Sequence, residues 1–172
     1  KFLKMYSVFV EHYQAISYPD IIKNSHIYYI NLAHRTDRND EIINELGKLN
    51  IPMTRIDAVK HEIGSFGCLQ SHIKALETAQ KDGHEYTFIC EDDFVFTNDN
   101  YKEDLVNVMN FDKLDWDVCL LTMNYPKITK KYKGGISRIK KSFTTSGYII
   151  KKRYLQTLID AWKSTILSVN GN

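Results

Sequence analysis

The sequence lacks the cysteine patterns that would fix a structural metal or an oxidising compartment. Its three cysteines, Cys68, Cys90 and Cys119, are far apart, and no two of them form a Cys-x-x-Cys pair. This spacing excludes a zinc-finger motif, and the odd number argues against a disulfide framework. Two of the three lie inside apolar segments, so we interpret the cysteines as buried thiols.

A strong net charge and a long apolar segment are also missing. The chain has 23 basic and 21 acidic residues, a net charge of +2, so no overall field favours nucleic acid or a membrane surface. No segment reaches the roughly 18 apolar residues of a membrane span. The opening residues 1–19 are interrupted by Lys4, Glu11 and His12 and are not typical of a signal peptide. We therefore expect no nucleic-acid partner and no transmembrane segment.

What the chain does contain is enough apolar material for one globular domain. It has 172 residues, of which 43% are hydrophobic and 12% aromatic. Compact apolar segments predict strands at 26–32, 52–59, 86–90, 116–122 and 144–150. Helical periodicity predicts helices at 36–50, 64–83, 99–111 and 151–167, and residues 123–135 predict a basic loop.

This alternation of strands and helices predicts an α/β domain with a mainly parallel sheet flanked by helices. We expect the domain to cover residues 26–172, with residues 1–25 as a helical extension at its N-terminal side. In sheets of this kind, ligands bind at the carboxyl ends of the strands.

Three adjacent acids stand at one such strand end. Glu91, Asp92 and Asp93 follow the buried segment YTFIC. Their mutual repulsion carries a cost that a cation or several hydrogen-bond donors would offset. Because side chains alternate along an extended chain, Glu91 and Asp93 should share one side while Asp92 points away. Such a pair of carboxylates suits Mn²⁺ or Mg²⁺, and the alternative is a solvated acidic loop.

Other strand ends carry polar residues suited to a phosphate or a nucleoside. Arg35 and Arg38 stand at the start of a predicted helix, where guanidinium groups suit a phosphate. Asp57 could accept from a ribose or a base. There are also plainer interpretations: Arg35 and Arg38 as a surface pair, and Asp57 as a turn residue.

The segment GSFGCLQSH before the next helix fits neither of the familiar glycine-rich nucleotide motifs. No Gly-Lys-Ser/Thr follows it, and Gly64 and Gly67 do not have the dinucleotide-binding spacing. Its amide groups could still face an anion. Ser71 and His72 lie in the first turns of that helix, where a histidine is either structural or catalytic.

Taken together, these motifs resemble glycosyltransferase family 25, which includes lipopolysaccharide glycosyltransferases and collagen galactosyltransferase-like domains. The resemblance runs over about residues 26–155 in chain order: YYINLAHRTDR, RIDAV, GCLQSH, FICEDDFVF and TTSGYIIKKRY. It implies a GT-A type fold that binds a UDP-sugar and uses Mn²⁺ or Mg²⁺. Glu91, Asp92 and Asp93 would form its DxD-like motif.

The resemblance also implies roles for individual residues. Asp93 would hold the metal between the two phosphates, with Glu91 as a second ligand, and Glu91 or Asp92 would contact the ribose. The remaining nucleotide-sugar-binding residues would be Asn31, Leu32, Asp57 and Ala58 around the uridine, Arg35 and Arg38 near the phosphates, and Ser71. The role of His72 stays open.

The implied reaction moves a hexose from the UDP-sugar to an acceptor hydroxyl on a glycan or a protein. The metal would neutralise charge on the departing UDP, and a carboxylate base would deprotonate the acceptor if the configuration inverts. Family members usually carry a further acid or histidine near a Trp beyond the segment TTSGYII. We therefore expect the C-terminal lid and the base to lie outside these residues, leaving an open acceptor side beside residues 127–133 and Thr144, Thr145 and Ser146.

Two alternatives remain at this point. The same acids could serve a Mg²⁺-dependent phosphohydrolase or nuclease, although the end of the fourth strand, LLTMNY, offers no further carboxylate. The chain could also be an inactive glycosyltransferase-like domain that binds a sugar nucleotide or a partner. The donor sugar, the acceptor and the compartment are left open.

Overall fold

The computed structural model describes residues 15–111, 115–132, 135–142 and 146–170. The elements in chain order are α1 Tyr18–Asn24, β1 Ser25–Asn31, α2 Thr36–Gly47, β2 Met53–Asp57, α3 Gly64–Asp82, β3 Tyr86–Glu91, α4 Tyr101–Met109, β4 Val118–Leu120, β5 Lys127–Lys131, β6 Ser137–Lys141, β7 Gly147–Lys151, the 3₁₀ turn η1 Lys152–Tyr154 and α5 Leu155–Asn170. No helix among the described residues is long and apolar enough to cross a membrane.

A five-stranded sheet in the order β2-β1-β3-β7-β4 forms the centre of the domain. β1 pairs in parallel with both β2 and β3, while β7 is antiparallel to both β3 and β4. The direction of β4 therefore agrees with that of β3, and β7 is the one reversed strand of this sheet among the described residues. The predicted α/β domain with a mainly parallel sheet is confirmed.

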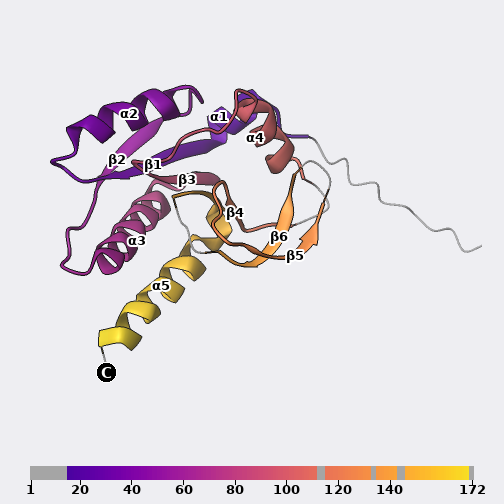
Figure 1. Ribbon diagram of the computed structural model, residues 1–172. Coiled ribbons are helices and arrows are strands. Elements are labelled where there is room, and N and C mark those ends of the chain that lie inside the picture. Colours follow the sequence, from indigo (N-terminus) through magenta and orange to yellow (C-terminus); the bar gives the residue numbers. More distant parts are fainter. Residues whose placement is uncertain (1–14, 112–114, 133–134, 143–145, 171–172) are drawn as a thin grey trace, which may run out of the picture.

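Helices cover both faces of the sheet. α1, α2 and α4 lie over one face, and α3 and α5 lie over the other (Figure 1). Successive side chains of β1 point to opposite faces of the sheet. Ile27 and Tyr29 pack in the first core, beneath α1, α2 and α4, and Tyr28 and Ile30 pack in the second core, beneath α3 and α5. A strand that is buried on both faces reads as a continuous apolar run, which explains the segment HIYYI.

The segment predicted as a basic loop is partly a strand. Lys127–Lys131 form β5, which pairs antiparallel with β6 to make a separate two-stranded sheet (Figure 1). All five residues of β5 are exposed. A strand without a buried face has no apolar alternation to reveal it, and its pairing partner lies further along the chain.

The predicted helical extension at residues 1–25 is described only in part. Of the predicted helical extension, Tyr18–Asn24 form α1, whose Ile21 is fully buried in the first core. Ser17 and Asp20 form a capping box at its start. Residues 1–14 lie outside the described residues, as do Thr144 and Thr145 of the predicted strand at 144–150.

Gly67 lets α3 approach the segment that follows β2. A Cβ atom at this position would lie 2.6 Å from the carbonyl oxygen of Val59, which is a backbone atom that cannot rotate away. Gly47, at the end of α2, has nothing within 4 Å of the equivalent position. Alanine substitutions at the two glycines therefore distinguish the effect of close packing on stability from the effect of helix propensity.

We expect Gly67→Ala to destabilise the domain by about 1–3 kcal/mol, because the backbone of α3 or of Val59 must shift. Gly47→Ala should instead be neutral or stabilise it by up to ~1 kcal/mol through helix propensity. Urea unfolding of both variants measures the difference. Equal changes in the two variants would contradict the close approach of α3.

Candidate functional site

The carboxyl ends of β1, β2 and β3 meet at one edge of the sheet. Asn31, at the end of β1, is in register with Asp57 of β2, and the neighbouring Ile30 is in register with Glu91 of β3. Motifs that are separated by up to 60 residues in the sequence therefore meet at this edge, because parallel strands end on the same side of the sheet.

Asp92 is held from the α2 side of the sheet. The Asn31 side-chain amide donates to Asp92 Oδ2 at 2.9 Å, and Arg38 Nη1 lies 3.0 Å from Asp92 Oδ1. The Asp92 side chain is only 13% exposed, so the Arg38 guanidinium compensates a carboxylate that has lost most of its water. Asn31 is itself fixed, because Arg55 Nε donates to its Oδ1 at 3.0 Å.

Glu91 is held from the opposite side, by α3. Its Oε1 lies 3.2 Å from His72 Nε2 and 3.9 Å from Cys68 Sγ. Its backbone N–H donates to the carbonyl oxygen of Ser146, just before β7. Glu91 and Asp92 therefore leave the strand end toward opposite faces of the sheet, as the alternation of side chains predicts.

Asp93 differs from its two neighbours. In the described part of the chain, no other side chain forms a hydrogen bond or an ion pair with its carboxylate. Burial, followed by the negative charge of Glu91, raises the pKa of Asp93 above its ordinary value, and Arg38 opposes this shift. Asp93 is thus an exposed carboxylate in a negative local field, which is the environment that a hard cation would relieve.

The two arginines of the first strand end have different partners. Arg38 contacts Asp92, as described above, whereas the Arg35 guanidinium is paired with Asp37 at 2.6 Å. The hydrogen bonds that the Arg35 guanidinium donates to Asp37 hold the pKa of the Asp37 carboxyl well below its usual range. A phosphate that approached Arg35 would therefore compete with a neighbouring carboxylate, while Arg38 already lies next to the three acids.

The residues predicted to surround the uridine follow β1 and β2. The Ala58 N–H donates to the Asn31 carbonyl oxygen at 3.0 Å, and the Leu32 carbonyl oxygen accepts from the Arg35 N–H at 2.8 Å. Asp57 is exposed and paired with Arg55 at 3.0 Å. These residues lie at the same edge as the acids, and their contact with a nucleoside stays a prediction.

Ser71 is buried in α3, and its hydroxyl holds the segment after β2. Its Oγ accepts from the Val59 N–H at 2.8 Å and donates to the Gly67 carbonyl oxygen at 2.6 Å. Both hydrogen-bonding functions are therefore directed at the protein backbone. The predicted contact between Ser71 and a nucleotide sugar would require the hydroxyl to exchange one of these partners.

Sequence reasoning did not identify Tyr148 and Arg55 as partners of site residues. Tyr148 contacts His72 from β7, and Arg55 contacts Asn31 from β2. Arg55 directly precedes Ile56 in the motif RIDAV, so its position next to a strand end was a usable signal. Tyr148 lies on a strand whose reversed direction no local pattern indicates.

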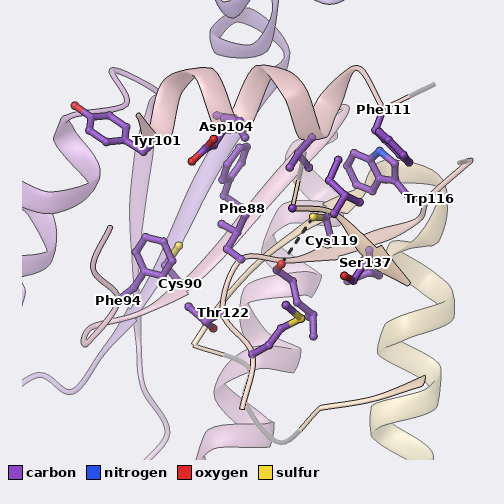
Figure 2. Close-up of a pocket in the computed structure, with 18 of the residues that line it drawn as sticks. Phe88, Cys90, Phe94, Tyr101, Asp104, Phe111, Trp116, Cys119, Thr122 and Ser137 are labelled. Atoms are coloured by element: carbon purple, nitrogen blue, oxygen red, sulfur yellow. Dashed lines mark hydrogen bonds between the residues drawn. The ribbon is translucent and has the colours of Figure 1, made fainter. Parts of the chain in front are cut away.

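A cavity lies beside this edge. It has a volume of about 920 Å³ and lies between α4, β4 and the β5–β6 sheet. Aromatic side chains line it, with Phe94 near one end and Phe111 and Trp116 near the other (Figure 2). None of the three acids lines this cavity, so we place the chemistry at the strand ends, where charged groups converge, and not in the cavity.

Comparison with known proteins identifies the family. The model of glycosyltransferase family 25 (LPS biosynthesis protein) matches residues 62–171, which is more than half of the chain. This chain belongs to glycosyltransferase family 25. The matched region includes the motifs GCLQSH and CEDDF, while the first two motifs of the sequence resemblance precede it. No curated protein matches the chain.

A solved structure shares the fold of this family 25 chain. It is titled as the crystal structure of a glycosyltransferase involved in the glycosylation of the major capsid of PBCV-1, with a TM-score of 0.55 at 10% sequence identity. The similarity covers 81% of this chain and 65% of that chain. At this identity the similarity shows the fold alone, and it supports the predicted glycosyltransferase-like α/β architecture.

The raised pKa of Asp93 predicts how stability changes with pH when a chelator is present. The folded protein binds the Asp93 proton more tightly than the unfolded chain does. This contribution to stability is complete below the ordinary carboxyl pKa, and it is lost as the pH rises through the raised folded-state pKa.

We therefore expect Asp93→Asn to be more stable than the wild type at pH 7, with a gain that vanishes as the pH falls below about 4. Because the side chain is exposed, the gain should be only a few tenths of a kcal/mol. Thermal unfolding at several pH values with EDTA measures it. A gain that grows toward low pH would contradict the direction of the shift.

Proposed function

We propose that this family 25 domain transfers a hexose from a UDP-sugar to an acceptor hydroxyl on a glycan or a protein, with Mn²⁺ or Mg²⁺ at the strand-end acids. The observation that carries the proposal is that the three acids differ in their side-chain partners. Asp92 is paired with Arg38 and Glu91 contacts His72, whereas Asp93 has no such partner among the described side chains.

The donor atoms at this edge fit a hard divalent cation. Asp93 offers carboxylate oxygens, and its raised pKa reflects burial and the charge of Glu91, both of which a bound cation would offset. Carboxylates combined with water and substrate phosphate are the usual ligands of Mg²⁺ and Mn²⁺. When bound, such a cation would stabilise the negative charge of the diphosphate leaving group.

The other residues of this edge are assigned to the donor. Asn31 is buried and holds Asp92, so it supports the site while its neighbours Leu32 and Ala58 face the nucleoside. Arg38 can share its guanidinium between Asp92 and a phosphate oxygen, because its side chain is 39% exposed. Transfer itself joins the acceptor oxygen to the anomeric carbon as the bond to UDP breaks, and we place the base outside this set of residues.

The metal assignment predicts that UDP binds more tightly when Mn²⁺ is present. Calorimetric titration of the protein with UDP should give at least tenfold tighter binding with Mn²⁺ than with EDTA. Equal affinity under both conditions would count against a metal-bridged diphosphate.

Asp93→Ala should remove this Mn²⁺ effect and abolish sugar transfer while the domain stays folded, because it removes the unpaired carboxylate. The measurement is UDP release from a panel of UDP-sugars, alongside thermal unfolding. Asp99→Ala is the matched control, since Asp99 is an exposed acid six residues further along the chain. Turnover of Asp93→Ala comparable with that of the control would refute the assignment, and UDP binding without any transfer in the wild type would indicate an inactive domain.

A further inference from the structure

His72 is a buried side chain with a polar partner on each ring nitrogen. It is 1% exposed, and its Nδ1 lies 3.2 Å from the Tyr148 hydroxyl while its Nε2 lies 3.2 Å from Glu91 Oε1. The Tyr148 ring stacks on the imidazole at a centroid distance of 5.7 Å, and the Trp162 ring meets it edge-on at 5.5 Å. Side chains from β7 and α5 therefore fix the orientation of the ring.

The hydrogen-bond partners indicate where the imidazole proton lies. An ionised carboxylate can only accept, so Nε2 must carry the hydrogen that points at Glu91. Burial raises the pKa of Tyr148 well above its ordinary value, so its hydroxyl keeps its proton and can donate to Nδ1. A hydrogen on Nε2 thus satisfies Glu91, and the Tyr148 hydroxyl is the hydrogen-bond partner of Nδ1.

The partner of Glu91 differs in kind from the partner of Asp92. The guanidinium of Arg38 brings a full positive charge to Asp92 at 3.0 Å. The His72 imidazole instead fixes the Glu91 carboxylate by a directed hydrogen bond. The charge of Glu91 is one of the causes of the raised pKa of Asp93.

Cys68 completes a group that resembles a set of metal ligands, but the hydrogen bonds account for the geometry. One ligand-type atom each of Cys68, His72 and Glu91 lies within 4.8 Å of the others. Both ring nitrogens of His72 already have oxygen partners, however, so a cation at this point would displace the Nε2 hydrogen bond. His72 is better explained as a partner of Glu91 than as a ligand.

We infer that His72 is a positioning residue of the proposed transferase site, whose hydrogen bond holds the Glu91 carboxylate at the strand end, so that Glu91 and Asp93 together attract the divalent cation. The inference rests on the proposed function. The histidine of the motif GCLQSH then orients a metal ligand and contacts neither the nucleotide nor the acceptor.

The first test compares three variants by Mn²⁺-dependent UDP binding and by turnover. His72→Leu removes the hydrogen-bond donor and fills the buried space with an apolar side chain. His72→Gln keeps an N–H donor at about the Nε2 position. Loss of a group that orients a metal ligand typically costs 10–100-fold in metal affinity or activity. The control is His26→Gln, because His26 lies near the opposite end of β1 and contacts Thr54.

We expect the apparent Mn²⁺ affinity of His72→Leu to fall about 10–100-fold, with part of the turnover restored at saturating Mn²⁺. His72→Gln should stay within about threefold of the wild type, as should His26→Gln. Wild-type Mn²⁺ affinity in a folded His72→Leu protein would overturn the inference, and so would a loss in His72→Gln as large as that in His72→Leu.

A second measurement separates failure of this inference from failure of the proposed function. A double-mutant cycle of His72→Leu and Glu91→Ala, followed by urea unfolding in EDTA, reports the contact without any substrate. We expect a coupling of about tenfold or more in the unfolding equilibrium constant. Absence of coupling would overturn the inference, whereas strong coupling in a wild type that does not bind Mn²⁺ and UDP would refute the proposed function instead.

Discussion

Mutual repulsion of three adjacent carboxylates is the constraint around which this sheet edge is organised. Glu91, Asp92 and Asp93 leave β3 within three residues, where like charges disfavour ionisation of one another. The protein reduces this cost from both faces of the sheet: Arg38 of α2 and Asn31 of β1 hold Asp92, and His72 of α3 holds Glu91. Among the described side chains none pairs with Asp93, the acid at which we propose a divalent cation.

The parallel part of the sheet makes this arrangement possible. Because β1, β2 and β3 run in the same direction, their carboxyl ends bring Asn31, Asp57 and Glu91 to one edge. Glu91 at the end of β3 and Asp92 in the turn directly after it then contact opposite helical layers. The direction of the strands thus brings the acids to this edge, and the turn after β3 separates their contacts.

The reversed strand β7 adds contacts that a fully parallel sheet would not provide. Ser146 accepts the N–H of Glu91 through its carbonyl oxygen, and Tyr148 brings its hydroxyl to His72. Gly147 lies between them, where a Cβ atom would come within 2.5 Å of the Phe94 ring. The backbone of β7 therefore packs directly against the segment that follows the acids and borders the aromatic cavity.

Local patterns in the sequence determined the alternation of strands and helices, the position of the three acids after a buried strand, and the motifs of family 25. These features follow from periodicity and from neighbouring residues, which a sequence displays directly. Only the tertiary structure decided that Arg38 and not Arg35 pairs with Asp92, and that the Ser71 hydroxyl bonds to the backbone. It also decided that Lys127–Lys131 pair as a strand. Each of these depends on a partner that is brought close by folding, and so does the contact of Tyr148 with His72, whose positions are 76 residues apart.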